Sequence, residues 1–237
     1  MNIQQLNIKI FADGADLKSI LELNKNPLIK GFTTNPSLMR KTGITDYRAF
    51  SKEVLKHIDK PFSFEVFADE FDEMEVQAKE IASWGNNVYV KIPVTNTRGE
   101  SSVELIEKLS HSGVKVNVTA VFTLEQVFDV AQALEGGEPS VCSIFAGRVA
   151  DTGANPSPLM LAAKAICNSM DKNIELLWAS PRELYNIIEA NNCNCDIITV
   201  GHDLLAKLNL FGKDLTEFSL ETVKMFFNDA QKAGYTL

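Results

Sequence analysis

The chain has 237 residues, a length that fits a single large domain. Hydrophobic residues make up 45% of it and charged residues 23%, the balance of a globular protein that can bury a substantial core. Its formal net charge of −8 and its pI near 5.0 argue against a nucleic-acid or anionic-membrane partner, because such surfaces attract basic proteins.

The N-terminal residues lack the charged start, apolar run and cleavage site of a signal peptide, and no stretch approaches the ~18 apolar residues of a membrane span. The four cysteines, Cys142, Cys167, Cys193 and Cys195, fit neither a disulfide framework nor a zinc site. Cys193 and Cys195 could bind a metal, but no second pair lies nearby. We therefore expect a cytoplasmic protein with reduced cysteines and no metal.

A short run of β-forming residues followed by a helical stretch recurs eight times along the chain. The starts of these runs lie about 20 to 35 residues apart, the size of one βα unit. The predicted strands are Ile8–Ala12, Leu28–Thr33, Phe62–Phe67, Val88–Ile92, Val114–Thr119, Val141–Phe145, Ile174–Trp178 and Asp196–Val200.

The segments between these strands carry apolar residues at helical spacing, which predicts amphipathic helices. The clearest stripes are Phe71, Met74, Ala78 and Ile81; Val103, Leu105 and Leu109; and Leu184, Ile187 and Ile188. Ser180-Pro181-Arg182-Glu183 has the pattern of a capping box with proline at the first helical position, so we expect a helix to begin after Ser180. A last amphipathic segment, Leu220 to Ala233, follows the eighth unit.

Eight alternating units in one undivided chain predict an α/β fold: a single (β/α)8 TIM barrel with an extra C-terminal helix, forming one domain over residues 1–237. An open, doubly wound sheet is the alternative. Such a sheet would usually carry a glycine-rich phosphate loop after its first strand, and the sequence Phe11-Ala12-Asp13-Gly14-Ala15 at that place is not one.

Polar residues follow seven of the eight predicted strands, where a barrel of this kind places its active site. They are Asp13; Thr33, Thr34 and Asn35; Glu65; Lys91; Asn117 and Thr119; Ser143 and Arg148; and Ser180 and Arg182. Because the carboxyl ends of parallel strands meet at one end of the barrel, we expect these side chains to converge there.

Lys91 is unusual because it stands inside the apolar run Val88–Val94. Lysines are almost never fully buried without a partner or a purpose. A lysine in such surroundings is desolvated, which favours the neutral amine that can attack a carbonyl group. The alternative is a structural lysine whose stem packs in the sheet while its ammonium reaches the rim.

Several of the other polar residues also have structural explanations. Asn35 and Ser180 could serve as helix N-caps, although a capped helix also presents free N–H groups to an anion. Arg148 and Arg182 could be surface charges, but two arginines and a serine at neighbouring strand ends favour a phosphate site. Glu65 could be a solvated charge, although apolar residues flank it in its strand.

The histidines divide into two groups. His57 and His111 fall on predicted helices and are expected at the surface, whereas His202 follows the eighth strand and could approach the site.

Two motifs make the chain similar to a known family. Gly31-Phe32-Thr33-Thr34-Asn35-Pro36-Ser37-Leu38 resembles the first signature of transaldolases. Val90-Lys91-Ile92-Pro93-Val94 resembles the strand that carries their Schiff-base lysine. The similarity runs from Asp13 to the final helix, and the length matches the short transaldolases, a group that also contains fructose-6-phosphate aldolase.

The resemblance implies four catalytic residues. Lys91 would form the Schiff base with the ketose donor, and Asp13 would take the proton of the C4 hydroxyl as the carbon–carbon bond breaks. Glu65, with Thr119, would hold the water used in forming and hydrolysing the imine. No cofactor or metal is implied, because the protonated imine is itself the electron sink.

The resemblance also implies a substrate-binding set. Asn35, Asn117 and Ser143 would contact the dihydroxyacetone fragment, and Arg148, Ser180 and Arg182 would bind the phosphate group. The complete set is Thr33, Asn35, Asn117, Ser143, Phe145, Arg148, Ser180 and Arg182. Pro181, between Ser180 and Arg182, is a local departure at a position that varies in the family.

Two positions separate transaldolases from their aldolase relatives. The family pattern has glutamate at Glu65 and phenylalanine at Phe145 in transaldolases, and glutamine and tyrosine in the aldolases. The resemblance therefore implies a homo-oligomeric transaldolase of the pentose phosphate pathway. It would move a dihydroxyacetone unit from sedoheptulose 7-phosphate to glyceraldehyde 3-phosphate. The alternatives are a fructose-6-phosphate aldolase that uses the same lysine, and a sugar-phosphate-binding protein without catalysis.

Overall fold

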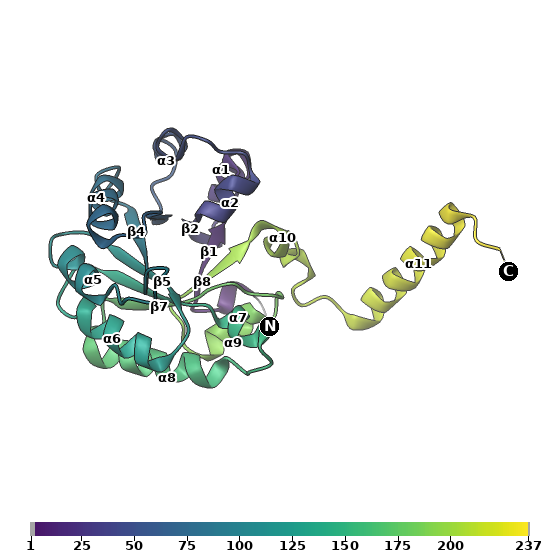
Figure 1. The fold of residues 1–237 in the computed structure, drawn as a ribbon. Coiled ribbons are helices and arrows are strands. Elements are labelled where there is room, and N and C mark those ends of the chain that lie inside the picture. Colours follow the sequence, from purple (N-terminus) through teal and green to yellow (C-terminus); the bar gives the residue numbers. More distant parts are fainter. Residues whose placement is uncertain (1–2, 237) are drawn as a thin grey trace.

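The computed structural model describes residues 3–236, which form a closed parallel barrel in which each strand pairs with the next and β8 pairs with β1 (Figure 1). The strands are β1 Lys9–Asp13, β2 Ile29–Thr33, β3 Phe62–Glu65, β4 Val88–Pro93, β5 Val116–Val121, β6 Ser140–Ile144, β7 Ile174–Trp178 and β8 Ile197–Gly201. The predicted (β/α)8 barrel is therefore confirmed, and closure of the sheet excludes the open, doubly wound alternative.

One or more helices follow each strand, and those that precede α11 in the chain surround the barrel (Figure 1). They are α1 Leu17–Asn24, α2 Pro36–Lys41, α3 Tyr47–Leu55, α4 Phe71–Ala82, α5 Val103–Ser110, α6 Leu124–Leu134, α7 Ala146–Asp151, α8 Ser157–Met170, α9 Asn186–Asn192, α10 His202–Leu205 and α11 Leu215–Ala233. Short 3-10 turns at Ile3–Gln5 and Leu208–Leu210 complete the described chain. None of the helices within residues 3–236 is long and apolar enough to cross a membrane.

Two apolar clusters position the site. The larger one lies between the strands and the helices and includes the stacked rings of Phe62 and Phe64, whose centroids are 4.3 Å apart. The smaller cluster contains Phe11, Leu177 and Ile197, which belong to three different strands. Side chains alternate along a strand, so the cluster residue Leu177 shares its face with Ala179, which borders the site cavity described below. The smaller cluster therefore fills the barrel interior next to that cavity.

The capping box expected at Ser180 is wrong. Ser180 has a φ of 63°, whereas an N-cap residue needs an extended backbone, and the helix begins only at Asn186. The side-chain oxygen of Asn186 accepts hydrogen bonds from the N–H groups of Arg182 and Glu183, at 2.7 and 3.0 Å. Residues 181–185 therefore form a turn held from within the following helix, and this turn keeps Ser180 at the rim of the barrel.

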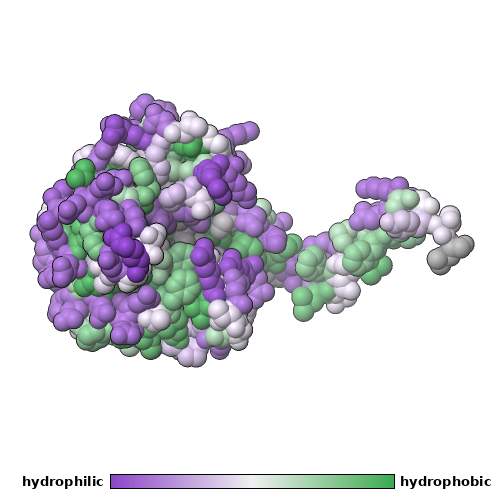
Figure 2. All heavy atoms as spheres, viewed as in Figure 1, coloured by the Kyte–Doolittle hydropathy of each residue, from purple (hydrophilic) through white to green (hydrophobic). Residues whose placement is uncertain are grey.

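The C-terminal helix α11 extends away from the barrel (Figure 1). The expected helix over Leu220–Ala233 is confirmed and begins earlier, at Leu215, where the Asp214 side chain caps it by accepting from the Glu217 N–H. Along its described length, Leu215–Ala233, no residue is buried, and Figure 2 shows hydrophobic atoms on its open surface. In this single chain, α11 therefore has an apolar face that its own barrel does not cover.

Candidate active site

The expected polar residues converge on one cavity of about 110 Å³ at the carboxyl ends of the strands. It is lined by Asp13, Thr33, Asn35, Lys91, Asn117, Thr119, Ser143, Phe145, Arg148, Leu177, Ala179, Ser180 and Thr199. Of the polar residues expected to converge here, Thr34, Glu65 and Arg182 are not part of this lining. Glu65 contacts the cavity through Lys91, and Arg182 lies beside it, as described below.

Lys91 occupies a sheltered position on β4, with 8% of the residue exposed. Its Nζ lies 2.8 Å from Oε2 of Glu65 and donates a hydrogen bond of 3.0 Å to the backbone oxygen of Thr34. Glu65 and Lys91 are register partners on adjacent strands, which places the two side chains together. The amine therefore faces the cavity next to a carboxylate that can accept or return a proton.

Asp13 ends β1 and accepts a hydrogen bond of 2.7 Å from the hydroxyl of Thr33. Burial raises the pKa of the Asp13 carboxyl above its usual value, while the charge of Lys91 and the Thr33 hydrogen bond act in the opposite direction. Desolvation has the larger effect, so this carboxyl holds a proton to a higher pH than an exposed aspartate does. Such a group can act as a general acid or base beside the amine.

A buried polar network crosses the barrel above the apolar interior. Asn117 donates from Nδ2 to the Ser63 hydroxyl at 3.0 Å, and the Ser143 hydroxyl donates to Oδ1 of Asn117 at 2.7 Å. Because both ends of the Asn117 amide are engaged, its orientation is fixed. Ser63 was not predicted as a site residue, although it stands among phenylalanines in a short strand.

The eighth strand also contributes a polar side chain, so the expectation that seven of eight units take part was too low. The Thr199 hydroxyl is hydrogen-bonded to the Thr33 hydroxyl, and Thr199 lines the cavity. A threonine inside the apolar run of residues 197–200 was the available signal. Its significance depends on the pairing of β8 with β1, which only closure of the barrel creates.

Aromatic stacking organises the opposite wall. The Phe145 ring stacks on Phe122 with centroids 5.7 Å apart, and the Arg148 guanidinium lies 4.9 Å from the centroid of Phe145. Gly147 brings α7 against the end of β7, because a Cβ at this position would lie 1.6 Å from the Ser180 backbone oxygen. This close approach places Arg148 and Ser180 on the same cavity.

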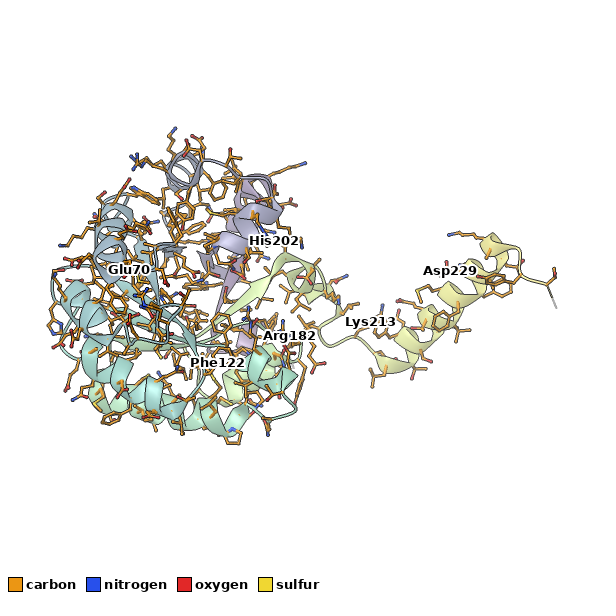
Figure 3. The ribbon with its side chains drawn as sticks, in the orientation of Figure 1. Glu70, Phe122, Arg182, His202, Lys213 and Asp229 are labelled. Atoms are coloured by element: carbon orange, nitrogen blue, oxygen red, sulfur yellow. The ribbon has the colours of Figure 1, made fainter. Side chains whose placement is uncertain are left out.

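Arg182 does not line the cavity that Arg148 and Ser180 share. Its guanidinium forms a two-pronged ion pair with Asp151 at the end of α7, in which Nε donates to Oδ1 at 3.0 Å. Arg182 borders a neighbouring recess that it shares with Asp13 and Ser180. The Arg182 side chain is exposed and is labelled in Figure 3. The three residues predicted to bind a phosphate therefore lie along one rim, with Arg182 held to a carboxylate.

Asn35 and the histidines fit the readings that the sequence allowed. Asn35 caps α2 by accepting from the Leu38 N–H at 3.0 Å, and it also lines the cavity. His57 and His111 are exposed, as expected. His202 begins α10 (Figure 3), and its ring packs on Gly14, whose added Cβ would lie 2.5 Å from Nε2. Burial lowers the pKa of His202, which favours the neutral ring beside Asp13.

Two of the three non-glycine residues with positive φ within residues 3–236 lie at this end of the barrel. Ala120 and Ser180 have φ angles of 61° and 63°, a region that non-glycine residues seldom adopt. Ala120 follows Thr119 within a register shift of β5, and Ser180 lines the cavity. Strain of about 1–3 kcal/mol per residue persists only where the surrounding structure enforces it, which is typical of functional sites.

The chain is similar to known proteins over most of its length. The family model for "Transaldolase/Fructose-6-phosphate aldolase" matches residues 10–237. A protein of Streptococcus agalactiae serotype V named "Probable transaldolase" is 34% identical over 215 residues, covering 91% of this chain and 95% of that protein. A Brucella anthropi protein with the same name is 35% identical over 227 residues, covering 96% and 98%.

One solved structure shares the fold at low sequence identity. The "putative phosphonomutase from Burkholderia cenocepacia J2315" superposes with a TM-score of 0.59 at 11% identity, covering 98% of this chain and 96% of that one. At this identity the likeness supports the barrel alone. The family match and the relatives extend over nearly the whole sequence, and on that basis the chain belongs to the transaldolase/fructose-6-phosphate aldolase family of enzymes.

Proposed function

We propose that this protein is a transaldolase that transfers a dihydroxyacetone unit from sedoheptulose 7-phosphate to glyceraldehyde 3-phosphate, as a step of the pentose phosphate pathway. The observation that carries the proposal is the sheltered amine of Lys91 at the cavity, 2.8 Å from the Glu65 carboxylate. Once the amine has passed its proton to this carboxylate, it can attack a ketone. The family membership supplies the substrate class.

The proposed chemistry follows from the positions of four side chains. The Lys91 amine adds to the ketone carbon of the donor to give a carbinolamine. The hydroxyl of this carbinolamine takes a proton from Glu65 and leaves as water, which Glu65 and Thr119 hold. The resulting protonated imine accepts the electrons of the breaking C3–C4 bond, while Asp13 takes the proton of the C4 hydroxyl. Erythrose 4-phosphate leaves, and the same steps run in reverse on glyceraldehyde 3-phosphate to give fructose 6-phosphate.

The buried polar residues bind the fragment that stays on the enzyme. Asn117 and Ser143 are already fixed by hydrogen bonds, so they can contact the dihydroxyacetone hydroxyls with little reorganisation. Asn35 and Thr33 complete that part of the cavity. The substrate phosphate binds along the rim to Arg148 and Ser180, with Arg182 joining when its guanidinium turns from Asp151 towards the phosphate.

Transfer is favoured over release of free dihydroxyacetone by the identity of two residues. Glu65 is a carboxylate rather than an amide, and Phe145 offers no hydroxyl to activate water for that release. The intermediate should then persist until an aldehyde arrives. The test is cleavage of fructose 6-phosphate with and without erythrose 4-phosphate. We expect turnover to require the acceptor, and comparable turnover without it would identify a lyase.

The nucleophile can be identified directly. Borohydride reduction in the presence of fructose 6-phosphate should trap an adduct on Lys91, located by mass spectrometry of the digested protein. Lys91→Met should abolish the adduct and the activity while the purified variant remains folded. An adduct on another residue, or one that persists in Lys91→Met, would show that the proposed nucleophile is wrong. Activity should also be unchanged by EDTA, because the proposed chemistry needs no metal.

We further propose that the protein forms a homo-oligomer through α11 and works in the cytoplasm. Leu220, Val223 and Phe227 recur at helical spacing on α11 and are 53%, 60% and 64% exposed. A second copy of the chain could cover them. Light scattering should show that Val223→Glu/Phe227→Glu reduces the assembly to monomers, whereas an unchanged mass would remove α11 from the interface. The free, buried cysteines support a reducing compartment.

A further inference from the structure

The hydrogen-bond ladder between β2 and β3 stops beside the candidate catalytic carboxylate. Its last bond runs from the Thr34 N–H to the Ser63 backbone oxygen, at 3.1 Å. In a parallel pair the next two bonds would join the Glu65 N–H to the Thr34 oxygen, and the N–H of residue 36 to the Glu65 oxygen. Residue 36 is Pro36, which has no N–H and begins α2. The sheet therefore cannot supply the next donor to Glu65.

The hydroxyl of Tyr47 replaces the missing part of the ladder. It accepts a hydrogen bond from the Glu65 N–H and donates one to the Glu65 backbone oxygen, both at 2.8 Å. Tyr47 is the first residue of α3, and its ring packs against Phe64 and Trp84, with centroid distances of 6.4 and 6.0 Å. Burial raises the pKa of the Tyr47 hydroxyl, so the group stays protonated and remains able to donate.

This replacement has a second consequence at Lys91. In a continued ladder the Thr34 oxygen would accept from Glu65, but here it accepts from the Lys91 Nζ at 3.0 Å. The Glu65 side chain meets the same nitrogen at 2.8 Å. The Tyr47 hydroxyl thus holds the backbone of Glu65 in place. The Thr34 backbone oxygen, which it replaces as the acceptor from Glu65, remains available to the Lys91 amine.

We propose that Tyr47 is a positioning residue, which sets the Glu65 carboxylate and the Thr34 carbonyl around the Lys91 amine without touching the substrate. The inference rests on the proposed Schiff-base function of Lys91. Its physical basis is that Glu65 is the last residue of a four-residue strand. The position of its side chain therefore depends on how firmly its two peptide groups are held. The hydrogen bonds of both peptide groups, one from the Glu65 N–H and one to the Glu65 oxygen, are made with the same Tyr47 hydroxyl.

The test is Tyr47→Phe, which keeps the ring and its packing and removes only the hydroxyl. The rate of borohydride-trapped adduct formation on Lys91 should fall roughly 10- to 100-fold, the scale expected for a displaced catalytic group. The KM for phosphorylated substrates should change little, because the rim that carries Arg148 and Ser180 lies on other strands. A rate unchanged from the parent protein would overturn the proposal.

Controls separate this inference from the function on which it rests. Tyr89→Phe removes a phenol from the strand that carries Lys91 without touching Glu65, and it should trap the adduct at the parent rate. If the parent protein forms no adduct on Lys91, the proposed function fails. If the parent forms one and Tyr47→Phe forms it equally fast, only the role of Tyr47 fails.

A measurement on the unchanged protein covers the case in which Tyr47→Phe does not fold. The Glu65 amide lies at the end of a strand, yet it should exchange its hydrogen slowly because the Tyr47 hydroxyl accepts from it. Exchange as fast as that of an exposed loop amide would overturn the proposal.

Discussion

The ion pair between Lys91 and Glu65 makes a quantitative prediction about stability. The side chains are 10% and 20% exposed, and the charged atoms lie 2.8 Å apart. Glu65→Gln keeps the shape and one acceptor oxygen, but it removes the negative charge that offsets the ammonium. Removing one partner of a fully buried pair costs about 3–5 kcal/mol. Because water can reach Glu65, we expect a loss of about 1–3 kcal/mol here.

The opposite substitution should be less damaging. Lys91→Met removes the buried ammonium and fills a similar volume, while the freed Glu65 carboxylate can be hydrated from the cavity. The double variant Glu65→Gln/Lys91→Met should then lose less free energy of unfolding than the two single variants lose together, by a coupling energy of about 1–2 kcal/mol. In a chain of this size, each kcal/mol shifts Tm by roughly 2–4 °C.

Urea unfolding followed by tryptophan fluorescence measures these energies, since Trp84 and Trp178 both pack in the core around the barrel. The same cycle on Lys56 and Glu53, an exposed pair on α3 and its C-cap, is the matched control and should give a much smaller coupling energy, because water screens the two charges. If the coupling of Lys91 with Glu65 is no larger than this control, the carboxylate does not hold a charged amine in the free protein, and the reasoning is refuted.

Three further predictions concern the same end of the barrel. Burial raises the pKa of Asp13 in the folded state, so its contribution to stability is full below the unfolded value of about 3.9 and is lost as pH rises through the folded value. Asp13→Asn should therefore raise Tm at pH 7, by an increment that shrinks towards pH 4, and a constant increment would contradict this. Gly147→Ala should cost about 2–4 kcal/mol in urea unfolding, because its Cβ meets the Ser180 oxygen, whereas Ala150→Ser at an exposed position of the same helix should be neutral. Arg182→Ala should raise KM for phosphorylated sugars with little change in kcat, and an unchanged KM would exclude it from the phosphate site.

The fold could be predicted in large part because its signals are local. Strands buried on both faces read as β-branched runs, and the helices between them read as apolar stripes, so the eight units were visible in order. The end of the barrel that carries the site also followed, because polar side chains stand where each strand ends. The capping box predicted at Ser180 was wrong because a four-residue sequence pattern does not specify the positive φ that Ser180 adopts.

Only those site residues whose type is unusual for their place in the sequence could be predicted. Lys91, Asp13 and Asn117 are conspicuous because each is a polar residue within or at the end of a largely apolar strand. Tyr47 and Thr199 look ordinary in the sequence, and they acquire a role only through hydrogen bonds to residues far away along the chain. The partners of an individual side chain are therefore much harder to predict than the strand that carries it.

The sequence by itself determined the order of the strands and helices, the end of the barrel at which polar groups gather, and the lysine on the fourth strand. These features depend on the pattern of apolar and polar residues close together in the chain. Tertiary structure alone decided that Arg182 is held by Asp151, that a tyrosine completes the ladder at Glu65, and that α11 leaves the barrel with its apolar face open. Each of these depends on distances between residues many positions apart, which are set only when the sheet closes and fixes every strand against its neighbours.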